Sequence, residues 1–577
     1  MVSNNVRQLT NCRMVFVCCI TRYMKDKIIN SSTNDSSRTV NTAQETIYKN
    51  LAQSAKNYPN KDAIIFYGHR ISYTELKNQV DYFAGFLQEQ CDVKKNDRIV
   101  LFLQNSPQFV IAYQAIVRAQ GIIVPVNPMN LAADLSYYVK DSESKVIITT
   151  QDLMPKLKSL IKTKAIQHTI VATFSDYIDT NTKLALPDSV AAPKEHFEEP
   201  NVHHWKDVID AKYKPLAYGA KSTDICVLPY TSGTTGKPKG CMITNGNLLH
   251  TALAPAQWIN LKSESTVLCS LPLFHATGMQ GSMNQPIYAG STVIIMTRWD
   301  RTTAAMLIEK YRISNWTCVP TMATDFLSNP ELKKFDLSSL KRIGGGGATM
   351  PESLAIKMLS LTGIEYREAY GLSETIGATH MNPQQRPKRK SIGIPIFSTE
   401  SMIIDPDTKE KLDFNKTGEI IIRGPQVFNG YWNNESASAK AFVEIDNKIF
   451  FRSGDLGYRD KEGYFFVVDR IKRMINASGL KVWPAEIEAV LHGHPNISEV
   501  CVIGTKDSYR GESVKAIVVL QKEKIENLQP DDIISWARTK MAAYKIPRVV
   551  EFTKSLPKTA TGKIMWRQLQ ELENSKR

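Results

Sequence analysis

One short segment constrains the fold and chemistry of this chain more than any other. Residues 228–240 read Leu-Pro-Tyr-Thr-Ser-Gly-Thr-Thr-Gly-Lys-Pro-Lys-Gly, with three glycines, four hydroxyl side chains and two lysines. An apolar strand pattern precedes it over 225–230, and a helical pattern begins after it at Asn245. Glycine lets backbone N–H groups turn toward an anion, and hydroxyl and ammonium groups also bind phosphate oxygens. The segment therefore predicts a polyphosphate-binding loop between a strand and a helix.

This loop differs from the Walker loop. The spacing from Gly233 to Lys237 is GxxGK instead of GxxxxGK[ST], and Pro238 follows the lysine. The alternative is an ordinary polar turn, but the density of glycines and hydroxyls over eleven residues argues against it. The candidate phosphate-binding residues are Thr231, Ser232, Gly233, Thr234, Thr235, Gly236, Lys237 and Lys239.

Strand and helix patterns alternate through most of the chain. An apolar run at 99–103, a helical pattern at 106–120 and a second apolar run at 122–126 predict a βαβ unit. Similar signals for strands recur at 145–149, 225–230 and 293–296, the last followed by a helical pattern at 301–311. We therefore predict an α/β fold with a large N-terminal body made of several subdomains.

The pattern changes near residue 469. A strand at 465–468 is followed by the densely charged run Asp469-Arg-Ile-Lys-Arg473, and about a hundred residues remain, enough for a small α+β domain. We predict three segments: a disordered tail or targeting segment at 1–41, a nucleotide-binding body at 42–468 and a mobile C-terminal domain at 469–577. Arg473 is expected to be a solvated linker residue.

Composition excludes several classes of protein. Hydrophobic residues make up 42% and charged residues 22%, which is typical of globular proteins, and no apolar run approaches the ~18 residues of a membrane-spanning helix. The net charge of +15 favours anionic partners, but no zinc-finger or RNA-binding motif indicates nucleic acid. The nine scattered cysteines, without a CxxC pair, predict free thiols in a reducing compartment.

The first forty residues are basic, poor in acids and without strong periodicity. The Arg-rich start is compatible with an organelle transit peptide. The favoured alternatives are a disordered tail or an over-extended start, with Met24 as the true first residue.

The segment Tyr230–Gly240 resembles the signature of the adenylate-forming acyl-CoA synthetases, a superfamily that includes luciferases and peptide-synthetase adenylation domains. The resemblance runs from about Thr42 to Lys563, and further motifs follow in the family order. It implies a two-step reaction. A carboxylate and ATP give an acyl adenylate and pyrophosphate, and the thiol of CoA then displaces AMP. The expected cofactor and co-substrates are Mg²⁺, ATP and CoA.

Two motifs resemble the family's nucleotide site. In Tyr370-Gly-Leu-Ser-Glu-Thr375, the resemblance implies that Tyr370 stacks on adenine, Ser373 holds the α-phosphate and Glu374 is the Mg²⁺ carboxylate. For Glu374 alone, the alternative is an acid at a helix N-terminus. The run Gly344–Gly347 implies close backbone approach beside adenine and the acyl tunnel, or else a flexible loop. The other nucleotide-binding candidates are Gly346, Ala348, Glu368 and Ala369.

Further family motifs surround the predicted domain boundary. By resemblance, Asp455 of Ser-Gly-Asp bonds the ribose hydroxyls and Arg470 also reaches the ribose, while Lys472 is the hinge of domain rotation. The segment 478–488 resembles the face that enters the site for thioester formation, and it supplies the CoA-binding candidates Gly479, Leu480 and Lys481.

Near the C-terminus, Leu-Pro-Lys-Thr-Ala-Thr-Gly-Lys563 resembles the last family motif. A lone lysine there would ordinarily be a surface residue. The motif instead implies that Lys563 contacts the α-phosphate and the carboxylate during adenylation, where its ammonium offsets negative charge. We therefore predict four catalytic residues: Lys563, Ser373, Glu374 and His275.

The segment 271–278 resembles a family segment at the acyl pocket, and the resemblance implies that His275 lies beside the substrate carboxylate as a wall or gate. A general base is not needed because an ionised carboxylate has no proton to remove. The remaining pocket candidates, each of which could equally be a core residue, are Gly278, Met279, Val319, Met322, Gly345 and Ile376.

These features favour a ligase that joins a fatty acid, expected to be long-chain, to CoA. An aryl-CoA ligase of the coumarate type is the alternative, as is an adenylate-forming enzyme with another acceptor. A peptide-synthetase module would need a carrier domain after Lys563, and only fourteen residues follow; Asn476 stands where luciferases have a lysine. The expected partners are the acid, ATP and CoA, without nucleic acid. We expect a cytoplasmic protein, with peripheral contact at the inner membrane face and organelle targeting left open.

Overall fold

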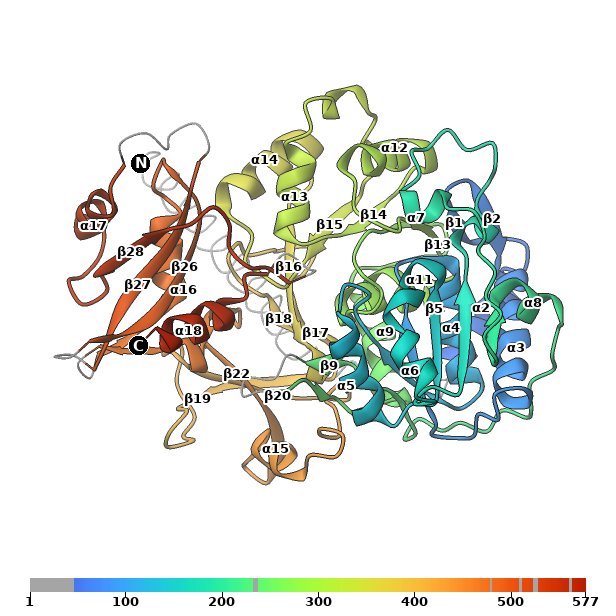
Figure 1. Cartoon of the computed structure of the whole chain (residues 1–577). Helices are drawn as coiled ribbons and strands as arrows, with labels where there is room; N and C mark the ends of the chain where they lie inside the picture. Colours follow the sequence, from blue (N-terminus) through green and yellow to red (C-terminus); the bar gives the residue numbers. More distant parts are fainter. Residues whose placement is uncertain are drawn as a thin grey trace, which may run out of the picture.

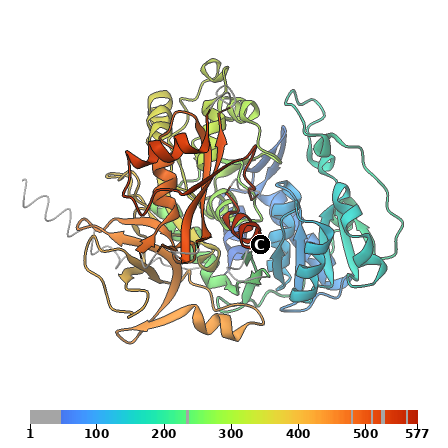
Figure 2. The same ribbon diagram turned by 60° about the vertical axis from the view of Figure 1, so that its left-hand side comes forward.

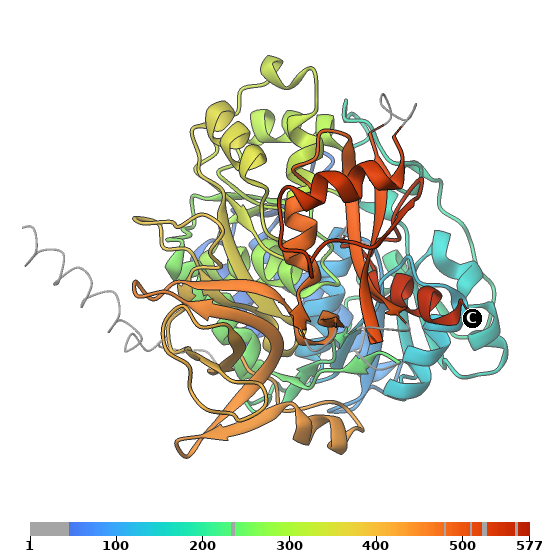
Figure 3. The ribbon, with the colours of Figure 1, turned by 90° about the vertical axis from the view of Figure 1, so that its left-hand side faces the viewer.

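The structure, a computed structural model, describes residues 46–231, 237–477, 480–507, 511–521, 528–559 and 563–576. Two large sheets form the body of the molecule, a smaller sheet lies below them in Figure 1, and the C-terminal domain stands to one side. The predicted tail at 1–41 lies outside the described residues. Turning the molecule brings the C-terminal domain forward over the centre of the body (Figures 2 and 3).

The first large sheet has seven strands. Its neighbours are parallel except for the β11–β8 pair. In sheet order the strands are β11 (Ile243–Thr244), β8 (Ile225–Val227), β4 (Ile122–Pro125), β3 (Arg98–Phe102), β5 (Val146–Thr150), β6 (His168–Ala172) and β7 (Val202–His204). The predicted βαβ unit is confirmed as β3, α4 (Pro107–Arg118) and β4. Helix α4 begins where the Ser106 hydroxyl accepts the Phe109 N–H, with Pro107 in the first turn.

The second large sheet has nine strands. Its central strands, from β16 to β1, are parallel, and antiparallel strands close both edges. In sheet order they are β18 (Ile394–Pro395), β17 (Gly377–Met381), β16 (Arg367–Leu372), β15 (Arg342–Gly345), β14 (Asn315–Thr317), β12 (Thr266–Cys269), β13 (Thr292–Ile295), β1 (Asp62–Phe66) and β2 (His69–Ser72).

Helices cover both sheets and pack with them mainly in two buried hydrophobic clusters, a large one that includes residues of both sheets and a smaller one on the seven-stranded sheet. Besides α4, they are α2 (Ile47–Asn57), α3 (Tyr73–Glu89), α5 (Ala132–Ser142), α6 (Lys158–Lys162), α7 (Asp188–Ala191), α8 (Trp205–Asp210), α9 (Asn245–Trp258), α10 (Ala276–Met279), α11 (Gln285–Ala289), α12 (Arg301–Tyr311), α13 (Pro320–Leu327) and α14 (Glu352–Thr362). None of the helices that the structure describes is both long and apolar enough to cross a bilayer. The six described cysteines are buried free thiols, as predicted.

A smaller sheet joins the body to the C-terminal domain. It consists of β19 (Glu400–Ile404), β20 (Gly418–Arg423), β22 (Lys448–Arg459), β21 (Phe442–Ile445) and β23 (Phe465–Arg470), with α15 (Glu435–Lys440) beside it. The domain boundary predicted at 468/469 falls inside β23. Arg470 is paired with Asp455 in the adjacent strand, so the last residues of β23 still belong to this sheet.

The C-terminal domain folds around a core of its own, formed by residues from Ile475 onward. Its elements are β24 (Ile475–Ala477), β25 (Leu480–Val482), α16 (Pro484–Leu491), β26 (Ile497–Asp507), β27 (Gly511–Leu520), α17 (Pro530–Arg538), β28 (Val549–Phe552) and α18 (Trp566–Ser575). The α+β class and the separate core agree with the expectation from the sequence. Helix α17 begins at Pro530, which occupies its first turn.

The expectation that Arg473 is a solvated linker residue is wrong. Its side chain is only 12% exposed and donates to Glu488 on α16, with one N···O distance of 3.2 Å. It also lies 3.7 Å from Asp469, which is 2% exposed, and donates to the Val502 carbonyl at 3.2 Å. The charge pattern of the segment did not reveal this burial, because the two carboxylates that surround Arg473 come from different elements.

We predict that Arg473→Ala destabilises the C-terminal domain by about 3–5 kcal/mol, since two largely buried carboxylates would lose their shared cation. Native-state hydrogen exchange of the β26 and β27 amides would measure the effect. Lys576→Ala is the matched control, because Lys576 pairs with Glu551 in the same domain but is 61% exposed. Equal effects of the two substitutions would contradict this account of Arg473.

Candidate nucleotide and acyl site

A deep cavity of about 1610 Å³ lies where the two large sheets, the smaller sheet and the C-terminal domain meet. Parallel strands of both large sheets end at it: β4 and β8 from one sheet, β12, β14 and β15 from the other. In open α/β sheets, ligands bind outside the carboxyl ends of the strands. The topology therefore makes this cavity the site to which the sequence motifs should converge.

Many of the predicted site residues line this cavity. They are Thr231, Lys237, Lys239, His275, Val319, Gly345, Gly346, Ala348, Ala369, Tyr370, Ser373, Glu374, Arg470, Lys472 and Lys563. More than three hundred residues separate the first from the last, so only the tertiary structure brings them together.

The two ends of the predicted phosphate loop form a short hairpin at the cavity. Strand β9 (Tyr230–Thr231) pairs antiparallel with β10 (Lys239–Gly240), so that Thr231 is opposite Lys239. The ammonium groups of Lys237 and Lys239 lie over the rings of Tyr137 and Tyr431, at 5.6 and 4.6 Å from the ring centroids. Both are therefore held at the cavity wall. The rest of the loop, Ser232, Gly233, Thr234, Thr235 and Gly236, lies outside the described residues.

In the glycine run at 344–347, the backbone packs closely against neighbouring backbone carbonyl groups. A Cβ on Gly345 would lie 2.0 Å from the Cys318 carbonyl oxygen, and one on Gly346 would lie 2.2 Å from that of Ala369. Gly347 adopts a φ of +89°, which disfavours any other residue. The missing side chains allow β15 to end directly on the cavity between β14 and β16.

One carboxylate organises the next part of the site. Asp455 on β22 accepts the Tyr370 hydroxyl at 2.6 Å through one oxygen and pairs with the Arg470 guanidinium at 2.9 Å through the other. Tyr370 and Arg470 line the cavity, whereas Asp455 is buried behind them. The Asp455 charge raises the pKa of Arg470, which keeps this cation charged at the cavity surface.

Glu374 lies in a short helical turn, Ser373–Thr375, at the start of β17. Burial raises the pKa of its carboxyl, while one oxygen accepts the Tyr431 hydroxyl at 2.9 Å. The carboxyl also accepts a hydrogen bond from its own backbone N–H, which lowers its pKa against the effect of burial. Tyr431 also lies below the Lys239 ammonium, so it links the predicted metal carboxylate to the phosphate loop. Sequence reasoning missed Tyr431, because a single tyrosine outside any motif gives no signal.

The C-terminal domain contributes Lys563 to the cavity. The backbone of Lys563 is held by Thr559: the Thr559 N–H donates to the Lys563 carbonyl at 2.8 Å, and the Lys563 N–H donates to the Thr559 hydroxyl at 3.1 Å. Desolvation, together with the nearby Arg470, lowers the pKa of the Lys563 ammonium to about 8, while Asp455 opposes the shift. Across the cavity, the pKa of His275 is lowered by desolvation and then by Lys563. The Lys563 ammonium thus lies close to a second cation, the Arg470 guanidinium, whose charge Asp455 partly offsets.

Lys472 also lines the cavity, directly after Arg470 at the junction of the two domains. Its hinge role stays a prediction. Of the predicted CoA-binding residues, Gly479 lies outside the described residues. The backbones of Leu480 and Lys481 form part of β25, but the directions of their side chains are not described.

The predicted acyl pocket matches the cavity only in part. His275, Val319 and Gly345 line it, but Gly278, Met279, Met322 and Ile376 are not among its described lining residues. Met279 and Ile376 are fully buried in the core, and a Cβ on Gly278 would lie 2.2 Å from the Pro272 carbonyl oxygen. The apolar lining instead includes Leu271, Phe274, Ala276, Val319 and Pro320. Resemblance to pocket-lining segments of a family does not separate a core residue from a neighbour that faces the cavity.

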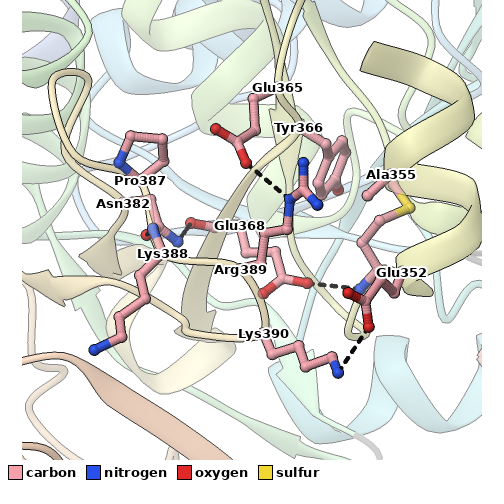
Figure 4. A pocket seen from close by; sticks show the side chains of 11 residues that line it. Glu352, Ala355, Glu365, Tyr366, Glu368, Asn382, Pro387, Lys388, Arg389 and Lys390 are labelled. Atoms are coloured by element: carbon pink, nitrogen blue, oxygen red, sulfur yellow. Dashed lines mark hydrogen bonds and ion pairs between the residues drawn. The ribbon is translucent and has the colours of Figure 1, made fainter. Parts of the chain in front are cut away.

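Glu368 does not line the large cavity either, although Ala369 beside it does. It lies in a small separate hollow of about 20 Å³ (Figure 4), where it accepts the Met350 N–H at 2.7 Å. Burial raises the pKa of Glu368 to about 7. The ion pairs Arg389–Glu365 and Lys390–Glu352, both at 2.9 Å, border the same hollow.

Comparison with known proteins agrees with this geometry. The family model described as AMP-binding enzyme matches residues 51–432, and the model of the AMP-binding enzyme C-terminal domain matches residues 486–563. The chain therefore belongs to the AMP-binding enzyme family, and its large body and small C-terminal domain have the fold of the adenylate-forming enzymes.

Particular relatives are similar over nearly the whole chain. A long-chain-fatty-acid–CoA ligase of Bacillus subtilis is 36% identical, covering 94% of this chain and 97% of the relative. A feruloyl-CoA synthase of an Amycolatopsis species is 31% identical, covering 89% and 96%. Among solved structures, a fatty acyl CoA synthetase of Mycobacterium tuberculosis matches with a TM-score of 0.69 and 27% identity, covering 91% and 98%.

The lowered pKa of Lys563 can be tested by chemical labelling. At pH 8 about half of its amine is neutral, against less than about 1% for an ordinary lysine, so Lys563 should react about a hundredfold faster with an N-hydroxysuccinimide ester. Below pH 8 its rate should fall about tenfold per pH unit. Mass spectrometry of labelled peptides would compare it with Lys558, another cavity lysine, which is paired with Glu499. Adding ATP should suppress the labelling of Lys563; a rate equal to that of Lys558 would contradict the prediction.

Proposed function

We propose that the protein is an ATP-dependent ligase that joins a long-chain fatty acid to CoA through an acyl adenylate. One observation carries the proposal. The Lys563 ammonium of the C-terminal domain lies in the same cavity as Arg470, His275 and the lysines of the phosphate loop. A group of cations around a cavity with an apolar wall suits a substrate that combines a polyphosphate with an apolar acid.

In the first step, a carboxylate oxygen of the acid attacks the α-phosphorus of ATP. The bond from this phosphorus to the bridging oxygen of the β-phosphate breaks, and pyrophosphate leaves with the electron pair. Lys563 would offset charge on the α-phosphate and the incoming carboxylate, which otherwise repel each other. Lys237 and Lys239 would hold the β- and γ-phosphates. Their fixed positions over tyrosine rings reduce the reorganisation needed during the reaction.

The nucleoside would be held on the opposite side by the network around Asp455. Tyr370 offers its aromatic face for adenine, and the Arg470 guanidinium lies within reach of the ribose. Asp455 is buried, so it would first act by orienting these two side chains. Each of its oxygens keeps a second lone pair for a ribose hydroxyl.

The residues present fit a magnesium ion. Mg²⁺ binds through one or two carboxylates and the substrate's phosphates, and it keeps several waters. Glu374 supplies one carboxylate, which lines the cavity and has one oxygen fixed by the Tyr431 hydroxyl. When bound, the ion would neutralise charge on the phosphates of ATP. Glu374 would hold it, and Tyr431 would fix the direction of the carboxylate.

In the second step, the sulfur of CoA attacks the carbonyl carbon of the acyl adenylate. The bond from this carbon to the phosphate oxygen breaks, and AMP leaves. Lys563 occupies the cavity in this arrangement of the domains, so we propose that rotation about Lys472 removes it and brings the segment around Gly479–Lys481 to the site. This division of labour supports two separable half-reactions.

The long acyl chain would lie along the apolar lining that includes Leu271, Phe274 and Val319. Similarity to the Bacillus subtilis ligase over 94% of the chain supports this substrate. Since long-chain acids partition into bilayers, peripheral contact with a membrane surface would assist their capture. The aryl alternative is favoured by one observation, the 31% identity to a feruloyl-CoA synthase.

A panel of acids tests the substrate. Exchange of labelled pyrophosphate into ATP should be stimulated by palmitate and oleate at least about tenfold more than by octanoate, since each buried CH₂ contributes about 0.8 kcal/mol to binding. Ferulate and 4-coumarate are the comparison acids. Stronger stimulation by these would establish the aryl alternative, and exchange with none of the acids would contradict the function as a whole.

Lys563→Ala tests the mechanism. Acyl-adenylate formation should fall by at least about 100-fold, because the ammonium stabilises charge only in this step. Thioester formation from supplied acyl-AMP and CoA should stay close to that of the unsubstituted enzyme. Lys558→Ala is the matched control, since Lys558 is on the same turn-bearing segment and is paired with Glu499. An equal loss in both half-reactions would contradict the proposed division.

A further inference from the structure

Far from the nucleotide cavity, three metal-ligating side chains gather at one edge of the seven-stranded sheet. Cys91 follows α3, His168 begins β6, and His203 lies in the middle of the edge strand β7. Their ligand atoms all lie within 4.8 Å of one another, and among the described residues they form the one group of this kind. None of the three lines the large cavity. They therefore have no part in the proposed ligase reaction.

We propose that Cys91, His168 and His203 form a binding site for a zinc ion. A thiolate and two imidazoles are ligands that zinc prefers, and three protein ligands with one water complete a tetrahedral site. The site would be independent of the nucleotide and acyl sites.

The distances suit this ion. The facing ring nitrogens, Nδ1 of His168 and Nε2 of His203, are 3.2 Å apart. With Zn–N bonds of about 2.0–2.1 Å at a tetrahedral angle, two nitrogen ligands are separated by about 3.3 Å. The pair of imidazoles is thus already spaced as in a zinc site. A Zn–S bond of about 2.3 Å would put Sγ of Cys91 about 3.6 Å from each nitrogen, so the sulfur would move by less than about 1.3 Å.

The sheet and its neighbours hold the two rings in place. Strands β6 and β7 are parallel neighbours, and the rings stack with centroids 5.5 Å apart and planes inclined by 18°. The ring of Phe86, on α3, contacts that of His203 edge to face at 5.0 Å. Residues that come before and after β6 in the chain thus preorganise the ligands, which reduces the ordering required when an ion binds.

The binding chemistry needs neutral imidazoles and a thiolate. His168 and His203 would each present a ring nitrogen lone pair to the ion, and the proton of the Cys91 thiol would be released to solvent when the ion binds. Cys91 is 7% exposed and both histidines are partly exposed, which leaves a route for the ion.

A bound ion would fasten β7 to the end of α3. Strand β7 has only three residues and one neighbouring strand, so few hydrogen bonds hold it to its sheet. Binding to the folded state alone stabilises a protein in proportion to the logarithm of the ligand concentration. The expected consequence is zinc-dependent protection of β7 and of the loop around Cys91.

The test uses the full chain, stripped with a chelator and dialysed against buffered free zinc. The unsubstituted protein should bind one tight equivalent per chain. Cys91→Ser should weaken this binding by at least about 10-fold. Loss of a residue that only hydrogen-bonds to a metal ligand already lowers metal affinity by about 10–100-fold, and Cys91 would be a ligand itself. Cys501→Ser is the matched control, because Cys501 is also a buried free thiol but lies in the C-terminal domain. Equal zinc binding by both variants, or no tight equivalent in the unsubstituted protein, would overturn the proposal.

Cobalt provides a second measurement that does not depend on affinity alone. Co²⁺ bound by the thiolate should give a sulfur-to-metal charge-transfer band in the near ultraviolet and tetrahedral bands in the visible spectrum. Cys91→Ser should abolish the first, and His203→Gln should alter the second. Pyrophosphate exchange should be unchanged in the Cys91→Ser variant, which shows that it is folded and separates this test from that of the ligase. Charge-transfer bands that survive in the Cys91→Ser variant would also overturn the assignment.

Discussion

The carboxylate of Asp455 is the interaction on which the geometry of the nucleotide site depends. It binds the Tyr370 hydroxyl of the nine-stranded sheet and the Arg470 guanidinium at the entrance to the C-terminal domain. Because Asp455 is buried, both bonds form in a low-dielectric environment and are correspondingly strong. The aromatic platform, the ribose-facing cation and the start of the C-terminal domain therefore have fixed positions relative to one another.

A second constraint is the space available at the strand ends. Gly345 and Gly346 border the cavity, and neighbouring carbonyl oxygens occupy the places where their Cβ atoms would lie, so a side chain at either position would force the adjacent strands apart. The same oxygens belong to the residues that end β14 and lie in β16. The close packing of these strands therefore requires the same glycines that border the site.

The electrostatic environment of Lys563 favours its position in the cavity only when an anion is bound there. Its ammonium lies near Arg470 and His275, and its lowered pKa shows that this position is unfavourable for a cation without an anion. Bound phosphates and a carboxylate would reverse the sign of that energy. A mobile C-terminal domain would therefore have a physical reason to deliver Lys563 when ATP and the acid are present, and to withdraw it once pyrophosphate has left. The buried Arg473 ion pairs belong to the C-terminal domain and its junction, so they would stiffen the element that carries the lysine.

The sequence by itself determined the local features: the alternation of strands and helices, the glycine- and hydroxyl-rich phosphate loop, the separate C-terminal domain and the order of motifs from Thr231 to Lys563. These features depend on short periodic patterns and on the chemistry of individual residue types, both of which can be read from neighbouring residues in the chain. The helix after the phosphate loop begins at Asn245 as predicted, but the loop does not lead directly into it, because the ends of the loop pair as the β9–β10 hairpin and β11 follows before α9 begins. Only the tertiary structure decided that Arg473 is buried, that Tyr431 fixes Glu374, that Met279 and Ile376 belong to the core, and that Cys91 meets His168 and His203. Each of these depends on which distant elements become neighbours, and a local pattern cannot encode a contact whose other half lies tens or hundreds of residues away.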